Sequence, residues 1–397
     1  MQTNTLNPIQ QSQRTAIVDI LRGWALLGVV IMNYMEFAKF NTSFPVSPKT
    51  DTWSTVTYTI LDLFFESKSW TLLSLLFGYG FAVLINNIQK KGYNPVKFFS
   101  ARMFWLFILA IINSCFFFGD ILKDYAVIGL ILLFFYRSSG RFAFIFALVI
   151  ILIYPAFVPL LRFIPSHVIS SFNSLLPLFH SKNILDVINF NLQGTYTRQI
   201  IESFYAIICH LIILACMLLG FSAYHLDVFN RLAEHKKYIV RTFWLSLLVS
   251  VLMDVLFVLT ERLKWGYTNY YFPYFMPALC TMTFIISAIC WLYISGKLKR
   301  LFNALQYMGR MTLTNYMVQN VISMFVFSGI GFGIYNNWHP AVVVCFAIGI
   351  YIIQIFFSKW WLKSYNYGPV EWLWRQLSYG KRLPIKKHVD NKKTEHK

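Results

Sequence analysis

The sequence predicts an all-α, polytopic helical membrane protein with about ten transmembrane helices. Hydrophobic residues make up 57% of the 397 residues and charged residues only 13%, whereas soluble proteins have about 45–50% apolar and about 25% charged residues. The 39 Phe, 23 Tyr and 12 Trp residues suit lipid-facing helices and interfacial aromatic belts. This composition excludes an ordinary cytosolic enzyme, a disordered chain and a nucleic-acid-binding domain.

Ten segments are candidate spans, because a transmembrane helix needs about 20 mostly apolar residues. They are residues 16–36, 56–87, 103–119, 121–136, 142–161, 200–224, 240–260, 271–295, 310–331 and 340–362. The second candidate contains charged residues between Asp62 and Lys68, so we expect a break between two half-helices there. The first is too long for a cleaved signal peptide, and no small-residue cleavage site follows it.

Basic residues alternate between the loops that connect these spans. The ten-span assignment places 26 of the 35 Lys and Arg residues on one side, in the N-terminal segment, in alternate loops and in the C-terminal tail. Because Lys and Arg are enriched in cytoplasmic loops, we expect both termini to be cytoplasmic. The net charge of +19 therefore reflects membrane topology, and we expect no nucleic-acid partner.

Cysteine labelling tests this topology. A reagent applied from outside should modify an engineered Ser181→Cys, because residues 162–198 are expected to form an external loop, and should not reach Ser138→Cys in a cytoplasmic loop. The reverse labelling pattern would contradict the assignment.

We expect a single transmembrane domain over residues 16–380, between a short cytoplasmic N-terminus (1–15) and a basic cytoplasmic tail (381–397). Within it, Gly368-Pro369-Val370-Glu371-Trp372 is typical of a helix start, because proline suits the first helical position and a carboxylate suits the first turn. A short helix over about 369–379 is expected to lie on the cytoplasmic surface.

Ionisable residues inside spans are the main functional signal, because they are costly in a bilayer and usually face a cavity or a partner. Asp120 and Asp124 open the fourth span, where carboxylates are stabilising in their own right; two so close can also supply a general base. His210 lies in the middle of the sixth span. It is expected to be either a hydrogen-bonded core residue or an acid–base catalyst. With Glu66 beside the expected break, these are the four candidate catalytic residues.

The outer ends of three spans are expected to converge on one polar pocket. Asn33 and Glu36 end the first span, Glu66 and Lys68 begin the spanning part of the second, and Asp120 and Asp124 begin the fourth. We expect Lys68 to neutralise the carboxylate that stays ionised.

The ninth span begins at Arg310 and places Asn315 and Gln319 on one face. These two amides are predicted to form a polar wall leading inward to Arg310, or alternatively to hydrogen-bond to a neighbouring helix.

Arg22 and Arg310 both lie about one turn inside the expected cytoplasmic ends of their spans. They are predicted to bind the phosphates of an anionic cofactor, since a guanidinium group matches phosphate geometry. The alternatives are that Arg310 extends to lipid headgroups, and that Arg22 forms an ion pair with Asp19 three residues earlier.

No soluble-enzyme signature is present, such as a P-loop, a Rossmann glycine pattern, HExxH or GxSxG. The six cysteines all lie in apolar segments, so we expect no disulfide framework and no metal site. Five motifs do occur in order along the chain. They are Asp19-Ile-Leu-Arg22-Gly23-Trp24, Lys68-Ser-Trp70-Thr71 with Phe77-Gly78-Tyr79-Gly80, Gly119-Asp120-Ile121-Leu122 with Tyr125-Ala126, Gly309-Arg310-Met311 with Leu313-Thr314-Asn315-Tyr316, and Gly368-Pro369-Val370-Glu371-Trp372.

In this order the motifs resemble the YeiB-like family, domain of unknown function 418, of bacterial membrane proteins. That family is similar to a wider group of transmembrane acyltransferases, which includes the heparan-glucosaminide acetyltransferases. The resemblance implies a multi-pass protein of the bacterial cytoplasmic membrane that moves an acyl group from cytoplasmic acyl-CoA to a sugar or lipid acceptor. The group's usual catalytic histidine lies on an early span, whereas this chain has no histidine before His167. Family members often have a histidine at the position of Asn113.

The alternative function is a small-molecule transporter or exporter without covalent chemistry. It explains polar residues within spans equally well and needs no catalytic histidine. Dependence on acyl-CoA would distinguish the two functions.

Overall fold

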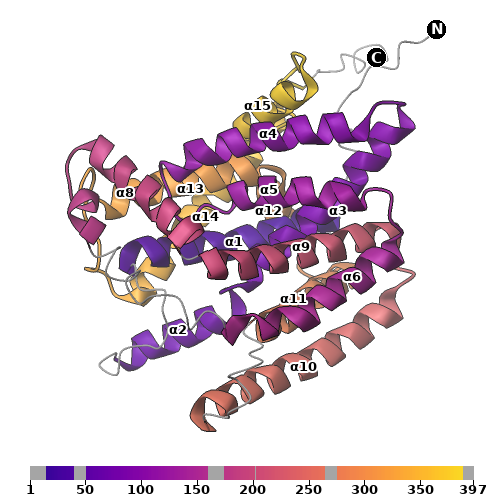
Figure 1. Cartoon of the computed structure of the whole chain (residues 1–397), viewed down its shortest axis with the longest axis horizontal. Helices are drawn as coiled ribbons and strands as arrows, with labels where there is room; N and C mark the ends of the chain where they lie inside the picture. The colour runs from indigo at the N-terminus through magenta and orange to yellow at the C-terminus, as the bar shows by residue number, and fades with distance from the viewer. Residues whose placement is uncertain (1–14, 40–50, 160–173, 202, 264–274, 388–397) are drawn as a thin grey trace, which may run out of the picture.

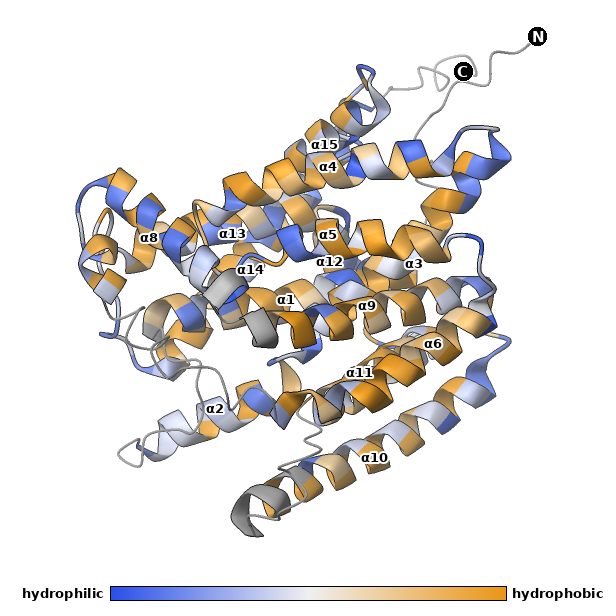
Figure 2. Cartoon of the chain, viewed as in Figure 1, coloured by the Kyte–Doolittle hydropathy of each residue, from blue (hydrophilic) through white to orange (hydrophobic). Residues whose placement is uncertain are grey.

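The structure is a computed structural model that describes residues 15–39, 51–159, 174–201, 203–263 and 275–387. These residues form a bundle of helices joined by turns (Figure 1). Within the described residues, β pairing is limited to an isolated bridge between Tyr365 and Lys386. The helices are mainly hydrophobic along their lengths, and hydrophilic residues gather in the turns and at helix ends (Figure 2). The all-α polytopic fold predicted from the sequence is confirmed.

Seven helices in the described part of the chain are long and apolar enough to cross a membrane. They are Ala16–Ala38, Thr52–Lys90, Pro95–Ser114, Ala206–His225, Lys236–Leu256, Met276–Ile294 and Pro340–Ser364. The count of ten is not confirmed, because the candidates at 121–136, 142–161 and 310–331 form shorter α-helices. These are α5 (Leu122–Leu132), α6 (Gly140–Ile153) and α13 (Thr312–Phe327). Helices of this length rise about 17–24 Å, less than the roughly 30 Å hydrocarbon core.

Most of the remaining helices overlap predicted spans, whereas Ile184–Tyr196 and Lys299–Arg310 form in stretches expected to lie between spans. The remaining helices are α1 (Ala16–Lys39), α2 (Thr52–Phe64), α3 (Lys68–Lys90), α4 (Pro95–Ser114), α8 (Ile184–Tyr196), α9 (Ser203–His225), α10 (Lys236–Leu263), α11 (Met276–Ile294), α12 (Lys299–Arg310), α14 (Pro340–Ser364) and α15 (Pro369–Tyr379). The expected break in the second span lies between α2 and α3, where Ser67 has a φ of 60°. Part of the expected external loop, residues 160–173, lies outside the described residues.

Helix α1 forms the centre of the bundle. It packs against α3, α12, α13 and α14, and Leu21, Ala25, Val30 and Tyr34 along it are buried completely. Helix α10 lies at the edge of the bundle, packed on α11 (Figure 1), and exposes apolar side chains along much of its length. Polar residues of α1 are therefore enclosed by other helices, whereas α10 presents a surface suited to lipid.

Glycines bring two pairs of helices into backbone contact. A Cβ on Gly78 of α3 would overlap the carbonyl oxygen of Met217 in α9, and one on Gly220 of α9 would overlap that of Leu75. Small residues such as Gly78 let the two helix backbones approach this closely. Helices α1 and α12 meet in the same way, through Gly23 and Gly309. Because Gly23 follows Arg22 and Gly309 precedes Arg310, this contact brings the two arginines to one region of the bundle.

Candidate functional site

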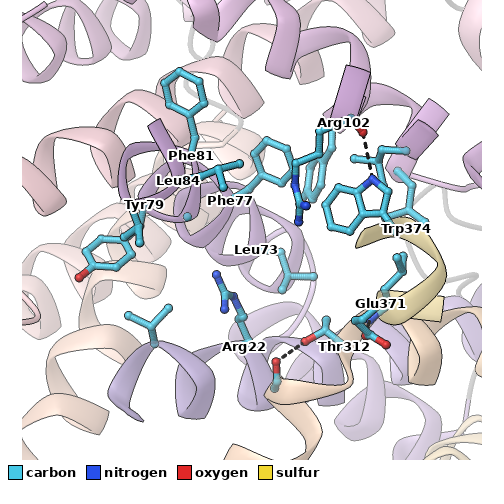
Figure 3. A pocket seen from close by; sticks show the side chains of 18 of the residues that line it. Arg22, Leu73, Phe77, Tyr79, Phe81, Leu84, Arg102, Thr312, Glu371 and Trp374 are labelled. Carbon is cyan, nitrogen blue, oxygen red and sulfur yellow. Dashed lines mark hydrogen bonds between the residues drawn. The ribbon is translucent and has the colours of Figure 1, made fainter. Parts of the chain in front are cut away.

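A cavity of about 320 Å³ opens beside the contact between α1 and α12. Its walls come from α1, α3, α4, α5, α12, α13 and α15, and four arginines line it: Arg22, Arg102, Arg310 and Arg375. Figure 3 shows the side chains of Arg22 and Arg102 extending into the same space from two different helices. The structure therefore brings together the two arginines predicted to bind a cofactor and adds two that the sequence did not single out.

Arg22 is held by contacts on two helices. Its guanidinium group donates to Asp19 Oδ1 over 3.1 Å and reaches the Leu76 carbonyl oxygen of α3 at 3.5 Å. A Cβ on Gly80 would lie 3.2 Å from Arg22 Nη2, so glycine leaves room for the arginine. The ion pair with Asp19, expected as the alternative to a binding role, is present. Arg22 also lines the cavity, so the ion pair with Asp19 fixes the position of the Arg22 guanidinium group there.

The other arginines are positioned by aromatic rings and by neighbouring charge. The Arg102 guanidinium group lies 3.6 Å from the ring centroid of Trp374, whose Nε1 donates to the Arg102 carbonyl oxygen (Figure 3). Arg375 lies over Tyr367, and planar stacking of this kind suits arginine. Burial and the positive charge of Arg310 lower the pKa of Lys387. Positive charge is thus concentrated here.

The rest of the cavity is mainly apolar and aromatic. Leu73, Phe77, Phe81 and Leu84 of α3 line it (Figure 3). Tyr125 of α5 and Tyr316 of α13 also line it; Tyr316 lies one helical turn beyond Thr312, on the side away from Arg310. The cavity therefore offers cationic groups to an anionic portion of a ligand and apolar surface to another portion.

Helix α15 forms one wall of the cavity and is attached through Glu371. The Glu371 carboxylate accepts hydrogen bonds from the backbone nitrogens of Leu313 and Thr314, at 2.7 and 3.1 Å, and from the Thr314 hydroxyl. A carboxylate at this position stabilises the N-terminus of α13. The segment predicted to start a short helix does so, and its acidic residue caps a different helix.

A buried network of hydrogen bonds begins at the Tyr316 side of the cavity. The Tyr316 hydroxyl donates to Asp120 Oδ1 over 2.9 Å, and Asn113 Nδ2 donates to the same oxygen over 2.7 Å. Asn320 donates to Asn113 over 3.3 Å, and Asn33 donates to Asn320 over 3.1 Å. Asn33 and Asp120 are therefore brought together, as predicted from the ends of their helices.

Asp124 has different partners from Asp120. His210 Nε2 lies 2.9 Å from Asp124 Oδ1, and Lys123 Nζ lies 3.8 Å from Asp124 Oδ2. Lys123 also donates to the backbone carbonyl of Asp120. Lys123 thus lies between two of the predicted catalytic carboxylates, and His210 joins this group through Asp124.

Two other predicted residues, Lys68 and Glu66, lie at the break between α2 and α3. Lys68 pairs with Asp62 of α2 at 3.8 Å, a carboxylate that was not among those expected in the pocket. Glu66 lies within electrostatic range of Asp62, Lys68 and Glu36.

The two amides expected to lead to Arg310 face α14 instead. Asn315 donates to Ser358 over 3.0 Å, and Gln319 donates to Gln354 over 2.6 Å. Both side chains are buried and do not line the cavity. The two amides therefore hydrogen-bond to a neighbouring helix, which was the alternative prediction. Thr312 and Tyr316, on the adjacent face of α13, line the cavity.

Among the residues that the structure describes, no group of three or more His, Cys, Asp or Glu side chains could hold a metal ion.

Comparison with known proteins finds similarity to one family and to three proteins. Residues 223–381 match the family described as "Protein of unknown function (DUF418)". Over 97% of its length, the chain is 25% identical to uncharacterized protein YxaH of Bacillus subtilis, of which it covers 99%. It is 26% identical to uncharacterized protein YeiB of Escherichia coli, over 92% of this chain and 96% of that protein.

The resemblance to the YeiB-like DUF418 family that the five motifs predicted is thus confirmed. An uncharacterized 39.9 kDa protein of Bacillus acidopullulyticus is also similar, with 27% identity over 97% of this chain and 100% of that protein. No solved structure matches the chain. The DUF418 match includes Arg310, Glu371 and Arg375 of the cavity, whereas Arg22 and Arg102 lie in the N-terminal half that the full-length relatives also cover.

Proposed function

We propose that this DUF418 protein is a membrane-bound acyltransferase that takes an acyl group from cytoplasmic acyl-CoA and passes it to a sugar or lipid acceptor. The observation that carries the proposal is the convergence of four arginines on a cavity whose remaining walls are mainly apolar. Arginine binds phosphate with paired hydrogen bonds. Acyl-CoA combines several phosphates with a long apolar portion, which suits both parts of the cavity.

The charge balance of the cavity supports an anionic ligand. Asp19 and Glu371 are the carboxylates that line it, and both are engaged, with Arg22 and with the start of α13. Among the described residues that line the cavity, the four arginines therefore outnumber the two carboxylates. In the proposed complex the phosphates lie among the arginines, and the thioester lies toward Tyr125 and Tyr316.

The topology predicted from loop charge supports a cytoplasmic donor. Arg22, Arg102, Arg310 and Arg375 all belong to the group of basic residues that the positive-inside rule assigns to the cytoplasm. Glu36 lies 14 residues beyond Arg22 in α1, a rise of about 21 Å. It pairs with Arg198, one of the basic residues that the predicted topology places on the external side. We therefore propose that the cavity opens toward the cytoplasm.

The His210–Asp124 pair is the proposed base for the acceptor. An ionised carboxylate only accepts hydrogen bonds, so His210 Nε2 carries a proton toward Asp124 and Nδ1 is the basic atom. His210 would remove the proton from an acceptor hydroxyl, whose oxygen attacks the thioester carbonyl carbon. The carbon–sulfur bond breaks and the acyl ester forms.

Binding of acyl-CoA to variants of the purified protein tests the donor site. We expect Arg22→Ala and Arg310→Lys each to weaken binding about 10- to 100-fold, because a charge-assisted hydrogen bond contributes about 1.5–3 kcal/mol. Calorimetry with detergent-solubilised protein measures this effect. Arg231→Ala is the control, since Arg231 is exposed and lies 3.9 Å from Glu234. Unchanged affinity in both cavity variants would remove the donor site.

The second candidate is an exporter of an anionic amphiphile. The buried network from Tyr316 through Asn113 and Asn320 to Asn33 favours it, because polar groups within a bundle also mark transport paths. An acyl-CoA labelled in its acyl group distinguishes the two. A covalently acylated product supports the acyltransferase, and movement of an unmodified compound without acyl-CoA supports the exporter.

A further inference from the structure

Tyr316 connects the arginine-lined cavity to the buried carboxylate of Asp120. Tyr316 lines the cavity, and its hydroxyl donates to Asp120 Oδ1. Asp120 itself is fully buried and does not line the cavity. Tyr125 lines the same part of the cavity, but its hydroxyl donates to the Trp70 backbone carbonyl over 2.8 Å. Of these two tyrosines, Tyr316 is therefore the one that joins the cavity to an ionisable group.

A chain of side-chain amides donates hydrogen bonds toward the Asp120 carboxylate. The amide groups of Asn33, Asn320 and Asn113 donate in sequence, and the last donates to Asp120 Oδ1. The other oxygen, Asp120 Oδ2, is buried and has no hydrogen-bond partner among the described residues. A buried carboxylate oxygen without a donor is costly when ionised, and it is a position that can hold a proton.

Beyond Asp120, titratable groups continue to the proposed base. Lys123 donates to the Asp120 backbone carbonyl and lies 3.8 Å from Asp124, which contacts His210. The groups come from α13, from the turn before α5, from α5 and from α9. Lys123 therefore lies between Asp124 and the backbone of Asp120, and His210 joins this group through Asp124.

We propose that Tyr316 and Asp120 form the proton relay that protonates the leaving sulfur. This inference rests on the proposed function. The acceptor's oxygen–hydrogen bond breaks and its proton goes to His210 Nδ1. The carbon–sulfur bond of the thioester breaks, the sulfur takes the Tyr316 hydroxyl proton, and Asp120, which carries a proton before the reaction, reprotonates Tyr316. His210 then releases a proton to water and Asp120 takes one up from water, so the net transfer is one proton from acceptor to thiol.

Substitution of the two tyrosines provides a matched test. Tyr316→Phe removes the hydroxyl and keeps the ring, and Tyr125→Phe makes the same change beside a backbone carbonyl. We expect Tyr316→Phe to lower kcat about 100-fold or more, because general acid–base catalysis typically contributes 10²- to 10⁴-fold. Acyl-CoA affinity should be unchanged. Tyr125→Phe should lose much less activity.

A second donor separates proton transfer from a purely structural effect. An aryl thioester releases a more acidic thiol, whose thiolate needs no proton to leave. Its transfer should be slowed much less by Tyr316→Phe than transfer from acyl-CoA, and the same pattern is expected for Asp120→Asn. Equal losses with both donors, or full activity of Tyr316→Phe, would overturn the relay while leaving the proposed function intact. Absence of acyl transfer by the unsubstituted protein would overturn both.

Discussion

Replacing Gly309 by alanine is expected to produce the largest loss of stability of the substitutions considered. The new Cβ would overlap the Asp19 carbonyl oxygen and crowd the backbone of α1. Backbone atoms cannot rotate away as a side chain can, so α1 and α12 would have to separate. Overpacking of this kind typically costs about 1–3 kcal/mol or more. Thermal unfolding of the solubilised protein should show a marked fall in Tm.

Gly349→Ala is the matched control, because Gly349 lies in α14 and a Cβ there has no neighbour within 4 Å. Alanine is the better helix former by about 1 kcal/mol, so Tm should stay the same or rise. Because Gly309 precedes Arg310, Gly309→Ala should also weaken acyl-CoA binding. An unchanged Tm for Gly309→Ala would show that α1 and α12 are not in backbone contact.

Glu371→Gln is expected to detach α15 from α13 and to open one wall of the cavity. The substitution removes a charge from the start of α13 and exchanges one accepting oxygen for an amide that donates. Leu313 and Thr314 would then lose a strong acceptor for their backbone nitrogens. Hydrogen bonds to charged groups contribute about 1.5–3 kcal/mol, so we expect a loss of about that size.

Tryptic cleavage at Lys381 and Arg382, just after α15, measures this detachment. Cleavage should be faster in Glu371→Gln than in the unsubstituted protein, and acyl-CoA should slow it if the ligand contacts Trp374 and Arg375. Glu234→Gln is the control, since that carboxylate is exposed beside Arg231 and such pairs contribute little. Equal cleavage rates in the two variants would contradict the role of Glu371.

The predicted polar pocket shows that the depth of helix ends in the membrane predicts only part of a site. Three helix ends were expected to converge because they lie at one depth, and Asn33 and Asp120 do join one network. Depth says nothing about rotation, however, and Lys68 turns toward Asp62 while Lys123 lies beside Asp120. Asn113 donates directly to Asp120.

Helix α13 shows that the sequence also does not predict which face of one helix meets the cavity. Asn315 and Gln319 were predicted to form a polar wall, and they do share a face, which meets Ser358 and Gln354 of α14. Tyr316 and Asn320, one residue further along, face Asp120 and Asn113. Successive helical residues point about 100° apart, so a small rotation decides which pair reaches the cavity.

Local pattern was enough to predict the membrane class, the break before Lys68, the Asp19–Arg22 pair and the start of α15, because each depends on residues near one another in sequence. The count of ten spans is not confirmed, because α5 and α13 end in turns that hydropathy does not register. The tertiary structure alone decided that Arg102 and Arg375 join Arg22 and Arg310, and that Glu371 caps α13. Those contacts depend on how helices cross and rotate, which is set by backbone contacts such as Gly309 against Asp19.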